Sequence, residues 1–217
     1  MTLTAAAIWD MDGVLVDTSR FHYQSWVQAI APEGIDLGFE QFIATFGMNN
    51  TTILKLWLGD DISQERLDRI DNLKEELFRQ LIVGQQLTLP GVGALLQALR
   101  QAGFRQAVAS SAPQANIDVI MASTGLLPFF DAVVSAWGMP GKPDPAVYLE
   151  AAARLGVPRA RCVVVEDAVA GVEGARRAGM RCLAVTNTNP AGLLSSATRV
   201  VDTLEGVSAD NFLQLLN

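Results

Sequence analysis

Acidic, hydroxyl and cationic side chains follow several short apolar segments of this 217-residue chain, either where a segment ends or in the loop beyond it. These residues are, in chain order, Asp10, Asp12, Ser110, Ser111, Lys142, Glu166 and Asp167. In open α/β sheets, ligands bind at the carboxyl ends of the strands. Since unbroken apolar segments are typical of parallel strands, the pattern predicts that these side chains line one crevice.

Four of the seven residues are acids, and they would repel one another in a shared crevice. Each carboxylate would raise the pKa of its neighbours. A bound cation removes this repulsion. A site made of carboxylates, a backbone carbonyl and waters suits Mg²⁺, which shares its shell with substrate phosphate. Lys142 and Ser110 would then supply the positive charge and the hydrogen bond for that anion.

Each group taken singly also has a structural explanation. The turn Asp10–Gly13 contains residue types that are common in turns, and Ser110 lies just before Pro113, where a helix N-cap is expected. Lys142 could be an ordinary surface lysine, and the acidic pair at 166–167 suits a helix N-terminus. The occurrence of all four groups, in order and at segment ends, favours a functional site.

Short apolar segments alternate along the chain with stretches of helical periodicity. The segments are 5–9, 106–109, 132–134, 162–165, 182–185 and 199–201. Helices are predicted over 92–100, 145–155 and 169–178, each followed by a glycine that can end it. This alternation predicts an α/β fold with a doubly wound, Rossmann-like parallel sheet.

The interval from about residue 18 to residue 85 departs from this alternation, because its periodicity is helical and it contains no strand pattern. We therefore predict an all-helical domain, 18–85, inserted into an α/β core formed by 1–17 and 86–217. The second linker contains Pro90 and Gly91, which are typical of a domain boundary.

Composition excludes several classes of protein. Half of the residues are hydrophobic and 18% are charged, which is typical of a chain that buries a substantial core. The formal net charge of −7 has the wrong sign for nucleic-acid binding. Cys162 and Cys182 are too few for a disulfide framework, and no apolar run approaches the ~18 residues of a membrane span. We expect a cytoplasmic monomer with no nucleic-acid or membrane partner.

The motifs resemble those of the haloacid dehalogenase-like hydrolase superfamily. The matching residues are Asp10-Met11-Asp12-Gly13-Val14, Ser110, Lys142-Pro143 and Glu166-Asp167, in that order. The helical insert is similar to the cap domain of the first subclass, which closes over the core. The runs Ile8–Thr18 and Gly141–Pro145 resemble the β-phosphoglucomutase-like branch and its sugar-phosphate phosphatases.

This resemblance implies a role for each matching residue. Asp10 would be the nucleophile that forms an aspartyl-phosphate, and Asp12 would protonate the leaving group and then accept a proton from water. Ser110 and Lys142 would bind the transferring phosphoryl oxygens. Magnesium would be bound by Asp10, by Asp167 and by the backbone carbonyl of Asp12. Glu166 would be a direct or water-mediated ligand.

The substrate-binding candidates are Ser111 in the core and His22, Asn49 and Asn50 in the helical insert. For His22, a structural role near the domain boundary is the alternative to substrate binding, and the structural role is favoured. The loop 47–52 contains Asn49 and Asn50 but no arginine, so it can hydrogen-bond hydroxyl groups but cannot neutralise a second phosphate. This favours hydrolysis over mutase chemistry.

We therefore expect a magnesium-dependent phosphatase that acts on a small phosphorylated metabolite, expected to be a sugar phosphate, through an aspartyl-phosphate. Two alternatives stay open. One is a β-phosphoglucomutase-like phosphomutase, which would need a bisphosphate activator. The other is a non-catalytic module that binds a phosphorylated metabolite, because fold alone does not establish catalysis.

Overall fold

The computed structural model describes residues 4–45 and 48–217. By its contacts the chain divides into two compact units. One is formed by Met1–Asp17 with Gln86–Asn217, and the other by Thr18–Gln85.

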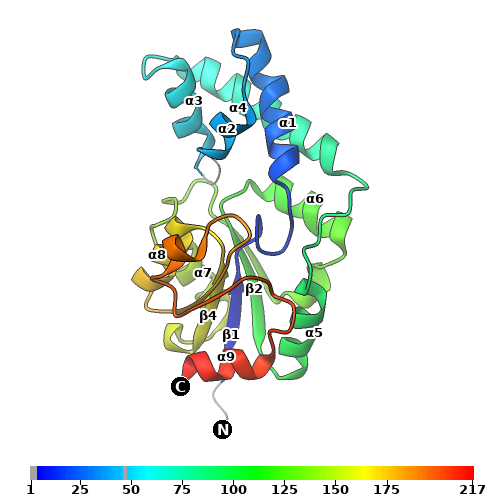
Figure 1. The fold of residues 1–217 in the computed structure, drawn as a ribbon, viewed down its shortest axis with the longest axis vertical. Helices are drawn as coiled ribbons and strands as arrows, with labels where there is room; N and C mark the ends of the chain where they lie inside the picture. The colour runs from blue at the N-terminus through cyan, green and yellow to red at the C-terminus, as the bar shows by residue number, and fades with distance from the viewer. Residues whose placement is uncertain (1–3, 46–47) are drawn as a thin grey trace. The chain divides into compact units, whose positions relative to one another are not determined.

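Within the described residues, the first unit contains one six-stranded parallel sheet in the order β3-β2-β1-β4-β5-β6. Its central strands β1, β2 and β4 are labelled in Figure 1. The strands are β1 (Ala6–Trp9), β2 (Arg105–Ser110), β3 (Ala132–Ser135), β4 (Cys162–Glu166), β5 (Arg181–Val185) and β6 (Arg199–Val201). Each strand coincides with one of the predicted apolar segments, so the predicted doubly wound sheet is confirmed. On one side of β1 lie β2 and then β3, and on the other side lie β4, β5 and β6. The topological switch is therefore between β1 and β4. Ligands bind at such a switch in folds of this type.

The core helices are α5 (Val92–Gln101), α6 (Gln114–Thr124), α7 (Ala146–Leu155), α8 (Val169–Arg177) and α9 (Ala209–Leu216), with short 3₁₀ helices at Leu127–Phe129, Arg159–Arg161 and Ala191–Leu194. The three predicted core helices are present as α5, α7 and α8. The helix α9 was not predicted from the sequence. Gly156 ends α7 in a left-handed conformation with φ 65°, which glycine adopts without strain.

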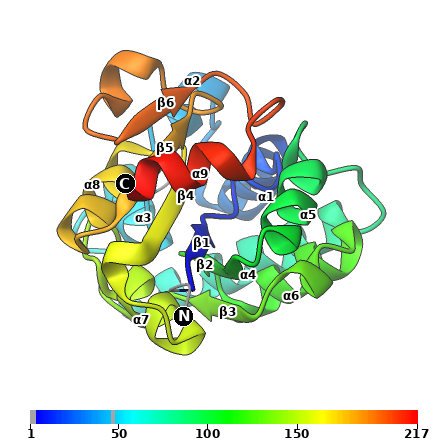
Figure 2. The ribbon, with the colours of Figure 1, turned by 90° about the horizontal axis from the view of Figure 1, so that it is seen from below.

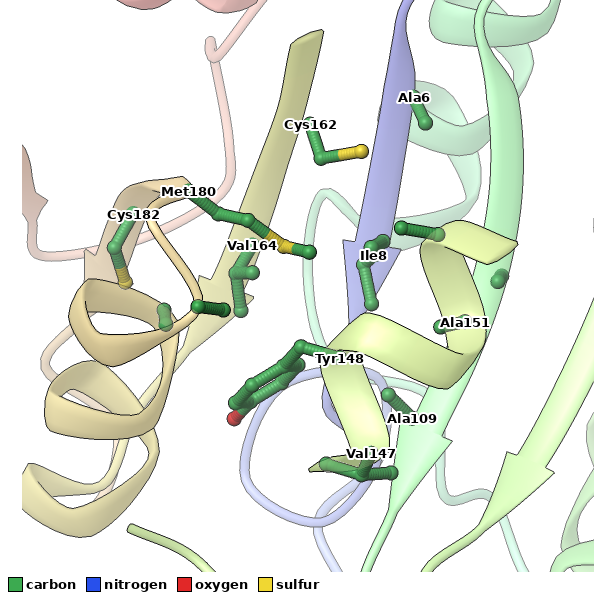
Figure 3. Packing of buried hydrophobic residues seen from close by; sticks show 14 of the residues in the cluster. Ala6, Ile8, Ala109, Val147, Tyr148, Ala151, Cys162, Val164, Met180 and Cys182 are labelled. Carbon is green, nitrogen blue, oxygen red and sulfur yellow. The ribbon is translucent and has the colours of Figure 1, made fainter. Parts of the chain in front are cut away.

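Helices cover both faces of the sheet, which explains why the strands are unbroken apolar runs (Figure 2). On one face, Ile8 and Val164 of the central strands pack against Tyr148 and Ala151 of α7, within a single buried cluster (Figure 3). On the other face, Trp9 of β1 contacts Phe212 of α9, with ring centroids 6.3 Å apart. Strand β1 is therefore packed on both of its faces, and Asp10 follows directly after it.

The unit Thr18–Gln85 is helical and contains no strand among its described residues. Its helices are α1 (Ser19–Ile30), a 3₁₀ helix (Ala31–Glu33), α2 (Phe39–Ile43), α3 (Asn50–Leu58) and α4 (Gln64–Ile82). It has an apolar core of its own, in which Trp26 of α1 and Trp57 of α3 meet edge to face at 5.2 Å. In the described part of the chain, no helix has both the length and the apolar character needed to cross a bilayer.

Candidate active site

Three buried acids meet at the carboxyl ends of β1 and β4. Asp10 follows β1, and its backbone N–H donates to the carbonyl of Val165 at 3.0 Å, which ties it to the neighbouring strand. Glu166 ends β4 and Asp167 follows it. One carboxylate oxygen from each acid lies within 4.8 Å of the others. The sheet topology therefore gathers three of the four predicted acids into a cluster small enough to bind one metal ion.

Lys142 reaches this cluster from the loop before α7. Its Nζ lies 2.5 Å from Oδ1 of Asp10 and 2.6 Å from Oε1 of Glu166. Only 10% of the Lys142 side chain is exposed. Burial alone would lower the pKa of Lys142, but the two carboxylates raise that pKa well above its usual value. Lys142 is therefore a buried cation paired with two acids, and the surface-lysine explanation does not hold.

Glu166 accepts hydrogen bonds on both of its carboxylate oxygens. Oε1 accepts from Lys142 and, at 2.6 Å, from the hydroxyl of Tyr148. Oε2 accepts from the backbone N–H groups of Asp167 at 2.9 Å and Ala168 at 3.0 Å. Burial works to raise the pKa of Glu166, but Lys142 and these hydrogen bonds hold it below its usual value. Glu166 is thus an ionised group with four donors, and its contact with Tyr148 was not anticipated from the sequence.

The charge on Asp10 is finely balanced. Burial raises the pKa of the Asp10 carboxyl to about 7, with Lys142 opposing the rise and the negative charges of Glu166 and Asp12 adding to it. A carboxyl in this state needs a nearby cation to remain ionised at neutral pH. Lys142 is one such cation, and a metal ion bound by the cluster would be a second.

Asp167 has a similar environment without a lysine in contact. Burial raises the pKa of Asp167 well above its usual value, and the charges of Glu166 and Asp10 raise it further. The hydroxyl of Thr188 hydrogen-bonds the Asp167 carboxylate and opposes this rise. If all three carboxyls were ionised, the cluster would hold more negative charge than the single ammonium of Lys142 balances.

The turn after β1 and the loop after β5 complete the site. Gly13 has φ +80°, and a Cβ built on it would overlap the carboxylate of Asp167 and contact Thr188 Oγ1. Asn187 Nδ2 donates to the Gly13 carbonyl at 2.8 Å, and Asn189 Nδ2 donates to the Asp167 carbonyl at 3.0 Å. The three loop residues Asn187, Thr188 and Asn189 were not predicted from the sequence. Their signal was the polar run directly after the fifth apolar segment, which ends at the same sheet edge.

The remaining core candidates also lie at this edge of the sheet. Asp12 is partly buried, and its charge contributes to the raised pKa of Asp10. Ser110 is buried at the end of β2, which pairs with β1, and its Oγ accepts from the backbone N–H of Ala112 at 3.1 Å. Ser111 is exposed in the following turn. Among the described residues, no hydrogen bond joins either serine to the acid cluster.

His22 packs within the helical unit. Its ring stacks on Phe78 with centroids 4.0 Å apart, and its Nδ1 lies 3.0 Å from Nζ of Lys74. Because an ammonium has no acceptor, Nδ1 of His22 accepts this hydrogen bond. These contacts favour the structural explanation for His22.

The two asparagines also have partners inside the helical unit. Asn49 is the N-cap of α3, and its side-chain oxygen accepts from a backbone N–H at 2.9 Å. The Asn50 amide donates to Asp71 at 2.5 Å and to Glu75 at 2.6 Å. Gly47, the first residue of the predicted loop 47–52, lies outside the described residues. The contacts of Asn49 and Asn50 are those expected of residues that stabilise the start of α3.

Comparison with known proteins identifies the family of this chain. The profile of the haloacid dehalogenase-like hydrolases matches residues 4–179. Hexitol phosphatase B of Escherichia coli K12 is 30% identical over 191 residues, which cover 83% of this chain and 82% of that protein. The Arabidopsis thaliana protein SUPPRESSOR OF QUENCHING 1, chloroplastic, is 31% identical over 96% of this chain, which spans 20% of that longer protein.

A solved structure agrees with these relatives. The crystal structure of β-phosphoglucomutase from Clostridium difficile matches with a TM-score of 0.87 and 26% sequence identity, over 99% of this chain and 98% of that one. The family profile, the curated relatives and the solved structure all indicate the same family. The chain belongs to the haloacid dehalogenase-like hydrolases, and within that family it is an enzyme of the phosphatase type.

Proposed function

We propose that this protein is a magnesium-dependent phosphatase that hydrolyses a small phosphorylated metabolite of the sugar-phosphate type. The observation that carries the proposal is the buried contact of Lys142 with both Asp10 and Glu166 at the switch between β1 and β4. A nucleophilic carboxylate next to a fixed ammonium suits attack on a phosphate group, because the ammonium keeps the carboxylate ionised and also attracts the phosphoryl oxygens.

The reaction would proceed in two displacements at phosphorus. First, an oxygen of Asp10 bonds to phosphorus as the bond from phosphorus to the substrate alcohol breaks, and Asp12 gives a proton to the departing oxygen. A water molecule then attacks the aspartyl-phosphate and gives its proton to Asp12. The bond between phosphorus and Asp10 breaks, and inorganic phosphate leaves. Asp12 thus serves as acid and then as base.

Ser110 and Lys142 would position the phosphoryl group during both steps. Positioning and charge neutralisation supply most of the catalysis in phosphoryl transfer. Lys142 is held by its two acidic partners, so its charge is in place before substrate binds. Ser110 lies at the end of the strand next to β1, with its hydroxyl at the same edge.

The donor set fits magnesium. Asp10 and Asp167 are buried acids with raised pKa values, and the cluster holds more carboxylates than cations. Oxygen ligands of this kind suit Mg²⁺. Asp10, Asp167 and the backbone carbonyl of Asp12 would bind the ion. Glu166 already accepts four hydrogen bonds, which favours contact through water. When bound, the ion supplies positive charge to the phosphoryl oxygens.

A phosphomutase is the second candidate, favoured by the full-length similarity to a solved β-phosphoglucomutase. Against it, residues 48–52 are Met-Asn-Asn-Thr-Thr and provide no arginine for a second phosphate. The similarity to hexitol phosphatase B supports hydrolysis of a phosphorylated sugar derivative. The non-catalytic alternative is set aside, because the chain is an enzyme of the phosphatase type.

A phosphate-release screen over a panel of phosphorylated sugars and sugar alcohols, with Mg²⁺ present, tests the proposal. Wild-type protein is expected to release inorganic phosphate without a bisphosphate activator. The Asp10→Asn variant should bind Mg²⁺ less tightly and release none while keeping its fold by circular dichroism. An isomerised phosphate ester formed only with added bisphosphate, and without free phosphate, would establish the mutase instead.

A further inference from the structure

We propose that Tyr148 is a positioning residue of this site. Through its hydroxyl it fixes the carboxylate of Glu166, and Glu166 in turn fixes the ammonium of Lys142 beside Asp10. The activity readout below depends on the proposed phosphatase function, whereas the spectroscopic readout does not.

Tyr148 lies in the buried layer between α7 and the sheet (Figure 3). Its side chain is fully buried, and its hydroxyl donates to Oε1 of Glu166 at 2.6 Å. Lys142 Nζ also lies 5.2 Å from the centroid of the Tyr148 ring, within the range of a cation–π contact. One side chain therefore contacts both members of the Lys142–Glu166 pair.

The other contacts of Glu166 show what the tyrosine hydroxyl adds. Oε2 is held by the backbone N–H groups of Asp167 and Ala168. The Tyr148 hydroxyl holds Oε1 from a third direction, so the carboxylate cannot rotate about its terminal bond. Oε1 is then fixed at the point where Lys142 donates to it. A phenylalanine would fill the same space but would leave Oε1 to Lys142 alone.

Two glycines of α8 lie where a side chain would meet Glu166 or Tyr148. Gly171 and Gly174 are three positions apart and so lie on one face of the helix. A Cβ at Gly171 would overlap the carboxylate of Glu166, and a Cβ at Gly174 would lie 3.0 Å from Cε2 of Tyr148. Glycine inside a helix is unfavourable compared with alanine. Two glycines on this face therefore indicate that the close approach of α8 to Glu166 and Tyr148 is required.

The chain provides a matched control, because it contains two tyrosines. Tyr23 donates its hydroxyl to the backbone carbonyl of Leu37 at 3.1 Å, within the helical unit. Tyr148→Phe and Tyr23→Phe thus remove the same atom and one hydrogen bond each. A merely structural hydroxyl would affect stability in both variants and kcat in neither.

Kinetics with p-nitrophenyl phosphate and Mg²⁺ form the first test. Tyr148→Phe removes one hydrogen bond to the charged Glu166, so Glu166 should fix the Lys142 ammonium less well. We expect kcat to fall about tenfold. KM should stay within about twofold, because the phosphate ligands themselves are retained. Tyr23→Phe should match wild type. If Tyr148→Phe keeps wild-type kcat, the positioning role is overturned.

A double-mutant comparison adds a second, independent kinetic test. Gly174→Ala should displace the Tyr148 ring by a few tenths of an ångström and lower kcat in the wild-type background. In the Tyr148→Phe background the same change should have little further effect on kcat, because the hydroxyl is already absent. Losses that multiply in the double variant would contradict the proposal.

The spectroscopic test needs no activity. Lys55, Lys74 and Lys142 are the lysines of the chain, so protein labelled with [ε-¹³C]lysine gives three resolved Cε signals. The signal lost in Lys142→Arg, which keeps a cation between the two acids, identifies Lys142. It should shift in Tyr148→Phe and stay in place in Tyr23→Phe, and an unshifted signal would overturn the proposal. If wild type releases no phosphate from any substrate, the phosphatase function fails, and this signal still decides the role of Tyr148.

Discussion

The carboxylate of Asp167 lies in the space that a Cβ on Gly13 would fill. Gly13 follows β1 and Asp167 follows β4, so two segments more than 150 residues apart meet without an intervening side chain. The absence of a side chain at Gly13 is therefore as necessary to the acid cluster as the acids themselves.

Gly13→Ala is expected to abolish phosphate release, because the new methyl group displaces Asp167. The control is Gly34→Ala, because Gly34 has the same φ of 80° but a Cβ built on it would have nothing within 4 Å. Both variants should lose about 1 kcal/mol of stability through backbone strain, and Gly13→Ala should lose more, because its Cβ also overlaps the Asp167 carboxylate. Only Gly13→Ala should lose activity, and phosphate-release assays on both variants measure this. Equal activity in the two variants would mean that the contact with Asp167 does not matter.

Lys142→Met should destabilise the protein strongly, because it leaves two buried carboxylates without their cation. Breaking a buried ion pair by removing one partner costs about 3–5 kcal/mol. Lys55→Met is the control, because Lys55 is exposed. Urea denaturation monitored by tryptophan fluorescence, without divalent metal at pH 7.5, measures the free energy of unfolding. Similar values for the two variants would show that Lys142 does not neutralise the cluster.

Asp167→Asn should stabilise the metal-free protein at pH 8 and remove most of the stabilisation that Mg²⁺ gives. The pKa of Asp167 is raised in the folded state, so the folded protein binds more protons than the unfolded chain above pH 3.8. The contribution of Asp167 to stability is therefore lost as the pH rises from about 4 toward its folded pKa. The melting temperature of metal-free wild type should fall more between pH 5 and pH 8 than that of the variant. Asp118→Asn, at an exposed position, should behave as wild type.

Removal of divalent metal should stop phosphate release and lower the melting temperature. Mg²⁺ at 100 times its dissociation constant stabilises a folded protein by about 2.7 kcal/mol if it binds only that state. Dialysis against EDTA followed by titration with MgCl₂ measures both effects. Full activity in EDTA would contradict a metal-dependent reaction, and Ca²⁺ provides a test of selectivity because it prefers more ligands at longer distances.

The sequence by itself determined the parallel sheet and the edge at which the chemistry lies. Apolar periodicity is a local property, so all six strands could be recognised, and Asp10, Ser110 and Glu166 were placed at strand ends directly from their position in the chain. The family motifs then assigned these residues their expected roles. The helical character of 18–85 could be read in the same local way.

Only the tertiary structure decided how these groups contact one another. Lys142 reaches Asp10 across 132 positions of sequence, and the loop after β5 adds Thr188 beside Asp167. Tyr148 appears in the sequence as one more apolar position of a helix, and its bond to Glu166 exists only because α7 packs across the sheet. Such contacts depend on which strands become neighbours and on how closely helices approach them. These are properties of the packed chain, and no local pattern encodes them.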